Sequence, residues 1–301
     1  MKNIPKTVNV HCTNHSRVGY GKEDIVVEKF LEISNDFNEN GKIVKEYHYI
    51  AENGLDSLTV NDYNEKGELT STAQYDGEGN MGQKLEFFYD DKGNVVKQNN
   101  YYGEDCPTFS NHFTYENGLL IRQDSYDDGH FVYTEKEYRY NDKGLLIEQI
   151  DFDEDGNRQY VTVNEYNDDG LVITRVRDEI LEKDRRTYHF EYDNKNKVKD
   201  LIYDYDEMLI AKIYYKYNDN GDIIETEEED LDNYRKTVYC FEGKKLMKVE
   251  ISDREGRILN WTEYEYDEQD NILNIVNYIR DEVDEDDFRI FTEYNYERIY
   301  E

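Results

Sequence analysis

The stretch Tyr138–Leu146, which reads YRYNDKGLL, decides the fold because close copies of it recur along the whole chain. Its turn glycine is Gly144, and the copies follow at intervals of about 26 residues. The equivalent positions hold Gly41, Gly67, Gly93, Gly118, Gly170, Gly221 and Gly243, with Asn196 and Asp270 where glycine is replaced. Repetition at a fixed period of this size is typical of repeat proteins, in which each unit buries its apolar side chains against its neighbours. The sequence therefore predicts about ten units of about 26 residues.

Each copy is typical of a β-hairpin. A type I turn followed by a left-handed Gly144 closes a three-residue loop, which sets Tyr140 opposite Leu146. Shorter loops fit a type I′ turn at Asn117-Gly118 and a type II′ turn at Gly243-Lys244. The same register predicts an aromatic residue opposite an aliphatic one in the other copies: Phe37–Ile43, Tyr63–Leu69, Tyr89–Val95, Tyr115–Leu120, Tyr166–Val172, Tyr192–Val198, Tyr217–Ile223, Phe241–Leu246 and Tyr266–Ile272. Three loop types preserve one contact, so the repeat is built around that contact.

A second turn falls about halfway between successive first turns, and its glycines are Gly79, Gly129, Gly156 and Gly256. Each unit is then two strands, so we expect an all-β protein of about twenty antiparallel strands in one meander sheet. Twist accumulates from strand to strand, and open sheets of more than about ten strands curl or split. We therefore expect a curved or spiralling sheet, a β-solenoid, with its Tyr/Leu face turned inward. Charged loops are expected where the second turn is lost, at 178–190, 226–238 and 280–290.

The chain is strongly acidic, with 36 Lys and Arg against 70 Asp and Glu and a net charge of −34. Such charge is typical of disordered chains, but the 30 tyrosines fall in register with the turns and indicate an ordered β protein. A negative field repels nucleic acid and anionic membranes and attracts cationic proteins. We expect a basic protein as the partner, and neither nucleic acid nor a membrane. The alternative is that the acidity only keeps a large sheet soluble.

Residues 1–22 differ from the rest of the chain. They carry four basic and no acidic residues, which gives +4 and leaves −38 on residues 23–301. We expect a basic N-terminal strand or cap that covers the first open edge of the repeat domain 23–301. The alternative is a basic arm that docks on the acidic body of the same or another copy. The segment lacks the apolar core of a secretory signal, and three scattered cysteines fit free thiols in a reducing compartment, so we expect a cytoplasmic protein.

Three potential metal ligands, His11, Cys12 and His15, lie within five residues. On a strand the two histidines share a face but lie about 13 Å apart, too far to bind one ion. No second Cys/His cluster follows in the sequence, so we expect no metal site.

Other sequences typical of sites fail on their context. Gly77–Gly82 matches Gly-x-Gly-x-x-Gly but lies between two strand patterns, where no helix could receive a pyrophosphate. The run from Asp151 to Gly156 begins like a calcium loop but has Thr162 where a bidentate glutamate is needed. No Gly-x-Ser-x-Gly motif occurs, and the six histidines give no sign of a catalytic triad. We expect no catalytic residues and no cofactor, and so a protein that is not an enzyme.

The repeat motif Tyr-x-Tyr-(Asn/Asp)-(Asp/Glu)-x-Gly-x-(Leu/Ile/Val) is most complete at Phe87–Val95, Tyr138–Leu146, Tyr215–Ile223 and Tyr264–Ile272. It resembles the YD repeat of the RHS family over about residues 30–300. The resemblance implies tandem β-hairpins in a spiralling sheet, in a family whose large members encase polymorphic toxins. The arginine that commonly follows the family's turn glycine appears only at Arg257, and the family's terminal core motif is missing. A weaker similarity exists to the MORN-like repeats of bacterial antitoxins.

Two functions fit these features. We expect a protein that binds and neutralises a basic partner, as an immunity protein or antitoxin neutralises a toxin. The alternative is a carbohydrate-binding or cell-surface module that uses exposed tyrosines. Acid is densest in two of the expected loops, and loops outside the repeat pattern usually carry a scaffold's recognition surface. The predicted partner-binding residues are Glu227, Glu228, Glu229, Asp230, Asp281, Glu282, Asp284, Glu285, Asp286 and Asp287.

Overall fold

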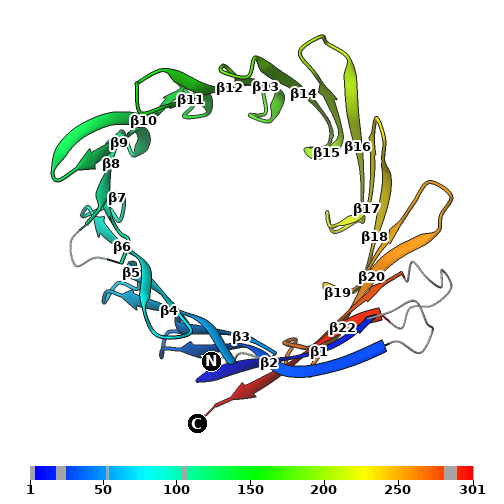
Figure 1. The fold of residues 1–301 in the computed structure, drawn as a ribbon. Coiled ribbons are helices and arrows are strands. Elements are labelled where there is room, and N and C mark those ends of the chain that lie inside the picture. Colours follow the sequence, from blue (N-terminus) through cyan, green and yellow to red (C-terminus); the bar gives the residue numbers. More distant parts are fainter. Residues whose placement is uncertain (1–3, 18–24, 52–53, 104–106, 281–289, 301) are drawn as a thin grey trace. The chain divides into compact units, whose positions relative to one another are not determined.

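The computed structural model describes residues 4–17, 25–51, 54–103, 107–280 and 290–300, and these form an all-β structure of 22 strands (Figure 1). The bounds are β1 Thr7–Arg17, β2 Ile25–Phe37, β3 Ile43–Ile50, β4 Gly54–Tyr63, β5 Leu69–Asp76, β6 Met81–Tyr89, β7 Val95–Tyr101, β8 Phe109–Glu116, β9 Leu119–Asp127, β10 His130–Tyr140, β11 Leu146–Phe152, β12 Arg158–Tyr166, β13 Val172–Glu179, β14 Asp184–Asp193, β15 Asn196–Tyr203, β16 Leu209–Tyr217, β17 Ile223–Asp230, β18 Tyr234–Glu242, β19 Lys245–Ser252, β20 Ile258–Tyr266, β21 Ile272–Ile279 and β22 Ile290–Ile299.

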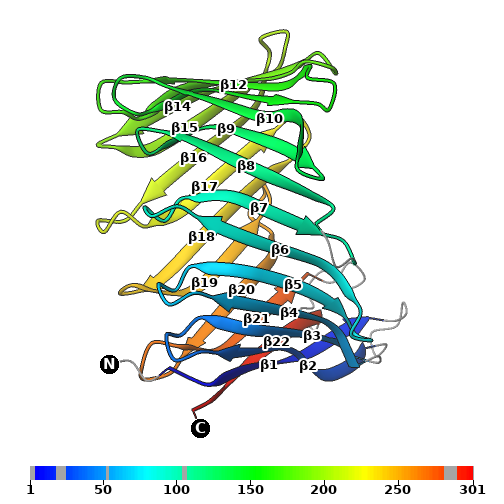
Figure 2. The ribbon, with the colours of Figure 1, turned by 90° about the vertical axis from the view of Figure 1, so that its left-hand side faces the viewer.

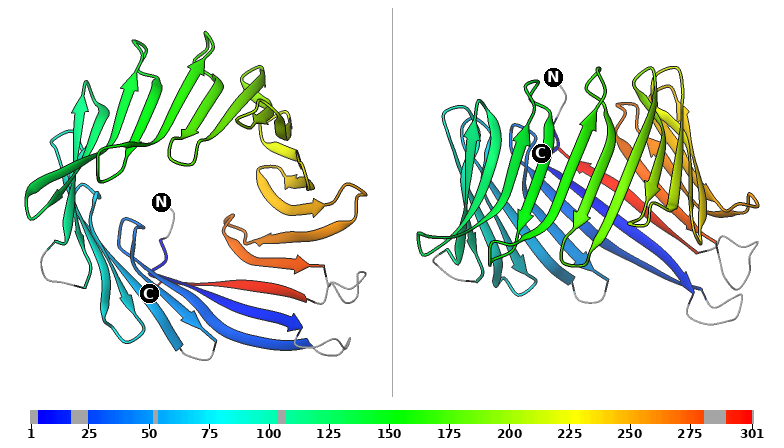
Figure 3. Two further views of the ribbon diagram at one scale, coloured as in Figure 1. Left: turned by 45° about the horizontal axis from the view of Figure 1, so that its top comes forward. Right: turned by 90° about the horizontal axis from the view of Figure 1, so that it is seen from above.

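The chain divides into two compact units. Unit 1 comprises residues 1–85 and 236–301, and unit 2 comprises residues 86–235. In unit 2, strands β7 to β17 pair consecutively and antiparallel. The turns of unit 2 alternate between the two ends of these strands (Figure 3). One end of unit 2 therefore carries all its first turns and the other end all its second turns.

Unit 1 contains the junction of the two ends of the chain. Strand β1 pairs with β2 on one side and, through Thr7–His15, with β22 on the other (Figure 2). All 22 strands belong to one sheet, and its first and last strands are hydrogen-bonded to each other. This is the strand order of a closed antiparallel β-barrel, so the expectation of an open meander sheet or β-solenoid is wrong. Closure removes both sheet edges, whose backbone groups would otherwise lack partners.

The first turns have the geometry expected from the sequence. In the β10–β11 turn, the Gly144 amide donates to the Asn141 carbonyl and the Asn141 amide donates to the Leu145 carbonyl, both at 2.9 Å. The Asn141 side-chain oxygen accepts from two further amides, those of Lys143 and Leu145. Gly144 has a φ of +76°, which a residue with a Cβ adopts only at a cost. The Asn or Asp that opens each loop of this type therefore supplies a cap.

The predicted aromatic-to-aliphatic pairs are largely confirmed. The observed register includes Tyr140–Leu146 and seven further predicted pairs, those of Phe37, Tyr63, Tyr115, Tyr166, Tyr217, Phe241 and Tyr266. The pair of Tyr192 is wrong by one residue, because Tyr192 lies opposite Lys197 rather than Val198. Asn194 and Lys195 both adopt positive φ and close a two-residue loop, so Asn196 already belongs to β15. The pairing of Tyr89 with Val95 stays a prediction.

A ladder of tyrosine hydroxyls joins successive repeats. The Tyr166 hydroxyl donates to the carbonyl of Leu146, which is the cross-strand partner of Tyr140 in the preceding hairpin, at 2.7 Å. The same bond, to the residue 20 positions earlier, is made by Tyr63, Tyr115, Tyr140, Tyr192, Tyr217 and Tyr266 at 2.7–3.1 Å. In the last strand Arg298 replaces the tyrosine as donor, and its guanidinium donates to the Ile272 carbonyl at 2.7 Å. Each repeat thereby satisfies a backbone acceptor of its predecessor.

Burial comes mainly from neighbours on the same sheet surface. Among the described residues, the buried apolar ones are Val10, Cys12, Ala73 and Ile150, and the other buried ones, such as Asn111 and Asp124, are polar. No described tyrosine is fully buried. The tyrosines therefore pack laterally along the sheet and stay partly exposed, and the expectation of a Tyr/Leu face turned inward stays a prediction.

Two of the expected charged loops are mainly strand. Residues 178–190 contain the end of β13, a four-residue turn and the start of β14, and residues 226–238 are built in the same way from β17 and β18. Most of the third segment, 280–290, lies outside the described residues. Basic residues lie opposite some of the acidic strand residues, as in the Asp178–Arg185 pair at 2.6 Å.

Candidate functional site

The first group of predicted partner-binding residues, Glu227–Asp230, lies on strand β17 rather than in a loop. Successive side chains of a strand point to opposite faces, so Glu227 and Glu229 share one face and Glu228 and Asp230 the other. The structure therefore divides these four carboxylates between two surfaces. The second group, Asp281, Glu282, Asp284, Glu285, Asp286 and Asp287, lies outside the described residues.

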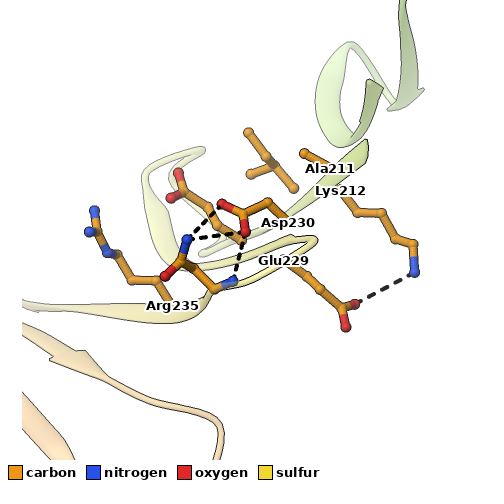
Figure 4. A pocket seen from close by; sticks show the side chains of 8 residues that line it. Ala211, Lys212, Glu229, Asp230 and Arg235 are labelled. Atoms are coloured by element: carbon orange, nitrogen blue, oxygen red, sulfur yellow. Dashed lines mark hydrogen bonds and ion pairs between the residues drawn. The ribbon is translucent and has the colours of Figure 1, made fainter. Parts of the chain in front are cut away.

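Three of these residues line a cavity of about 250 Å³ at the second-turn end of unit 2 (Figure 4). Its walls come from the start of β16, the end of β17 and the turn into β18. The lining residues are Ala211, Lys212, Ile213, Glu228, Glu229, Asp230, Asn233 and Arg235. We call this the edge cavity.

The three carboxylates of the edge cavity make different contacts. Asp230 caps its own turn, because its side-chain oxygen accepts from the amides of Asp232 and Asn233 at 2.9 and 2.7 Å. These bonds hold the pKa of Asp230 below its ordinary value, the bond from the Asp232 amide being the main cause. Glu229 lies 3.5 Å from the Lys212 ammonium (Figure 4). Glu228 is exposed on the other face from Glu229 and makes no hydrogen bond or ion pair with the residues that the structure describes.

Ion pairs across neighbouring strands hold many basic side chains of unit 2. Arg139 lies opposite Glu148 at 2.8 Å, and Lys199 lies opposite Glu191 at 2.9 Å. Such exposed pairs contribute little to stability. They do neutralise the basic residues locally, so the excess of carboxylates sets the sign of the surface charge.

The two second turns before β14 and β16 depart from the repeat in their backbone. Glu207 adopts a φ of +60° and Lys183 a φ of +54°, while Gly156 holds the equivalent left-handed position of a regular second turn, with a φ of +78°. A residue with a Cβ is strained by about 1 kcal/mol in this conformation. Asn194 and Lys195 adopt the same conformation in a first turn, so residues of this kind occur at both ends of unit 2.

The N-terminal segment holds His11, Cys12 and His15 apart. All three lie on β1, where Cys12 is buried and the His15 ring stacks on Phe291 at 3.9 Å. The His11 Nε2 lies 3.4 Å from the Glu297 carboxylate. Within the described ranges, no group of three or more His, Cys, Asp or Glu side chains is arranged to hold a metal ion.

An aromatic row crosses the junction of the chain ends in unit 1. Trp261, Tyr278, Phe291 and His15 lie opposite one another on β20, β21, β22 and β1. Their ring centroids are 4.6, 5.6 and 3.9 Å apart, and the two outer pairs are stacked. The Lys248 ammonium lies 5.1 Å from the Trp261 ring centroid. These ring faces therefore cover one another and stabilise the pairing of the first and last strands.

The sequence reasoning missed the basic and neutral members of the edge cavity, Lys212, Asn233 and Arg235. Lys212 could have been found by counting strand register outward from the first turn at Gly221, which sets it opposite Glu229. The regular spacing of the ladder tyrosines is visible in the sequence. Their hydrogen bonds are not, because the acceptors are backbone carbonyls, which every residue type has.

Comparisons with known proteins give distant structural similarity. No family model matches the chain, and no curated protein matches its sequence. It is similar to the crystal structure of TcdB2-TccC3-Cdc42, part of a Tc toxin with an RHS/YD-repeat shell, at 14% identity over 83% of this chain and 15% of that chain, with a TM-score of 0.38. A porin-like protein from Bacteroides uniformis shares 9% identity over 98% of this chain and 97% of that chain, with a TM-score of 0.36. This chain spans about 15% of the first structure, and at such TM-scores neither similarity decides a function.

The described residues contain no helix long and apolar enough to cross a membrane.

Proposed function

We propose that this chain is a non-enzymatic acidic repeat protein that binds and neutralises a basic protein, in the manner of an immunity protein or antitoxin acting on a toxin. The observation that carries the proposal is the excess of 34 carboxylates over basic residues in the whole chain. Some of these carboxylates, such as Glu182, Asp206 and Asp232, are exposed at the second-turn end of unit 2. Cross-strand pairing engages basic side chains, so an incoming cationic surface meets a negative field. Such a field speeds association and favours cationic partners.

The proposal also includes a repeat type and a cellular compartment. We infer that the repeats are YD-like repeats of the RHS type, because the Tyr-x-Tyr-Asn-Asp-x-Gly motif supplies both the first turn and the ladder tyrosine at Tyr140 and Tyr217. We also place the protein in the cytoplasm. Cys240 is a free, exposed thiol, which fits a reducing compartment.

The alternative of a carbohydrate-binding module requires aromatic faces open to a sugar. In the row from Trp261 to His15, stacked neighbours occupy the ring faces, and the hydroxyls of the ladder tyrosines are bonded to backbone carbonyls. These aromatic residues therefore support the fold. The exposed rings, such as Tyr205 and Phe131, lie at second turns beside carboxylates, which favours the basic-partner proposal.

The test is a binding titration with probes of defined charge. A labelled peptide in which lysine alternates with glycine should bind, and the matched glutamate peptide and neutral oligosaccharides should not. Binding should weaken steeply as salt rises from about 0.1 M to about 1 M, because the Debye length falls from about 10 to about 3 Å. Binding of the oligosaccharides alone would overturn the proposal.

A pair of charge reversals locates the binding. The variant E228K/D232K alters exposed carboxylates of the second-turn end, and D142K/D219K alters exposed carboxylates of first turns in the same unit. We expect the first variant to weaken binding of the lysine peptide several-fold more than the second. Equal effects would show that only net charge matters and that the edge has no special part in binding.

A further inference from the structure

Three consecutive second turns of unit 2 expose large apolar side chains at their tips. We call residues 180–183, 204–208 and 231–233 the three-turn edge. Its exposed apolar residues are Ile180, Leu181, Tyr205, Met208 and Leu231, with exposed fractions of 45–78%. Tips of neighbouring hairpins at one end of a sheet lie about 10 Å apart, because two strands separate them. The apolar side chains therefore form a strip along the edge rather than scattered single residues, and such strips mark interaction sites.

The opposite end of the same strands uses its apolar turn residues differently. Leu145 and Leu171 follow the glycines of first turns and are half-buried. A Cβ built at Gly170 would lie 3.6 Å from the Leu145 side chain, so that leucine covers the glycine of the next first turn. Only Phe88 and Ile173, at 44% and 37% exposure, are exposed large apolar residues within two positions of a described first turn of unit 2. Exposure of large apolar side chains is thus greater at the second-turn end of unit 2.

The three-turn edge also departs from the backbone pattern of the repeat. Its first two turns place Lys183 and Glu207 in the left-handed conformation, where a regular second turn has glycine. The Glu207 turn still forms the regular hydrogen bonds, from the Asp204 amide to the Met208 carbonyl at 3.0 Å and from the Glu207 amide to the Asp204 carbonyl at 3.1 Å. Turn formation therefore does not require the glutamate. The glutamate therefore places a charge at this tip at a conformational cost of about 1 kcal/mol.

The charges around the strip identify the kind of partner. Exposed carboxylates at Glu182, Asp206, Glu207 and Asp232 accompany one basic turn residue, Lys183. The edge cavity adjoins the last turn and adds Glu228, Glu229 and Asp230 against Lys212 and Arg235, so the carboxylates stay in excess. A second copy of this chain, a nucleic acid or an anionic membrane would be repelled by such an edge.

We propose that the three-turn edge docks an amphipathic basic segment of the partner protein. Apolar side chains of that segment cover Leu181, Tyr205 and Leu231, and its lysines or arginines pair with the surrounding carboxylates. The proposal rests on the proposed function and goes beyond it, because it names the surface and requires an apolar as well as a cationic contribution from the partner.

The experiment compares two labelled peptides of equal charge, one in which lysine alternates with leucine and one in which lysine alternates with glycine. Their affinities are measured for the wild type and for L181S/Y205S/M208S/L231S. The matched control F88S/V163T/I173T/Y214S changes four exposed apolar residues of unit 2 outside the edge. Circular dichroism and thermal melting confirm that each variant folds.

We expect the wild type to bind the leucine peptide at least about ten-fold more tightly than the glycine peptide, since burial of several apolar side chains contributes that much. The edge variant should lose this preference and keep its affinity for the glycine peptide, while the control variant keeps both. Equal binding of the two peptides by the wild type, or loss of the preference in the control variant, overturns the docking surface and leaves the proposed function standing. Binding of neither cationic peptide overturns both.

Discussion

The ladder of tyrosine hydroxyls predicts a specific loss of stability on removal of one oxygen atom. In the variant Tyr166→Phe, the ring stays and the 2.7 Å bond to the Leu146 carbonyl is lost. That carbonyl sits at a register shift of the hairpin, where the regular ladder of cross-strand bonds is interrupted. Loss of a hydrogen bond of this kind costs about 1 kcal/mol. The variant should therefore unfold at a urea concentration lower by several tenths of 1 M, given m-values of about 2–3 kcal/mol/M.

Truncation to Tyr166→Ala should cost more. The half-buried ring removes about 100 Å² of apolar surface from water, which is worth about 2.5 kcal/mol at about 25 cal/mol per Å². With the lost hydrogen bond, we expect about 3.5 kcal/mol, measured by urea unfolding followed by circular dichroism. Tyr205→Phe is the control, because its side chain is 64% exposed and its hydroxyl makes no bond to a described residue. Equal, negligible effects of Tyr166→Phe and Tyr205→Phe would show that the ladder does not stabilise the repeats.

Three further results are expected. Glu207→Gly should relieve the left-handed strain and raise the free energy of unfolding by about 1 kcal/mol, and the reverse change Gly156→Glu should lower it by a similar amount; a common sign for the two would refute this. Burial raises the pKa of five ladder tyrosines above 10, so folding favours their protonated form. This contribution to the free energy of unfolding is complete below pH 10 and is lost as the pH rises through the folded pKa values. The urea midpoint should therefore be lower at pH 11 than at pH 8. Burial and the neighbouring Glu32 raise the pKa of Cys12 to about 11, so a thiol reagent should modify the exposed Cys240 and spare Cys12 in the native protein.

Local geometry could be predicted because the repeat contains it. The spacing from Tyr140 through Gly144 to Leu146 determines a loop type, and the loop type determines the register. Tyr192 is the exception, because no glycine marks its turn and the positive φ of Lys195 is not encoded by its residue type. The charge of Glu227–Asp230 suggests a loop, but the stretch pairs with β16 as a regular strand, where Lys212 lies opposite Glu229.

Closure of the sheet could not be read from the repeat. It depends on β1, which lies outside the repeat pattern, and on pairs such as His11–Asn295 between residues at opposite ends of the chain. The sequence predicts that the N-terminal segment covers the first edge of the sheet. It does not predict that the other side of this segment pairs with the last strand. The three-turn edge was equally hidden. Charge marks two of its turns, within 178–190 and 226–238, but the apolar tips at Leu181, Tyr205 and Leu231 matter only because the fold brings them to one end of unit 2.

Site-specific photocrosslinking tests the central claim most directly. A benzophenone amino acid is placed at position 205, in the three-turn edge, or at position 219, in a first turn at the opposite end of β16. Each protein is irradiated with the labelled lysine-leucine peptide. We predict strong crosslinking from position 205, lost in high salt, and little from position 219. Equal crosslinking from both positions, or crosslinking only from position 219, would contradict the claim that this acidic protein receives a basic partner at its three-turn edge.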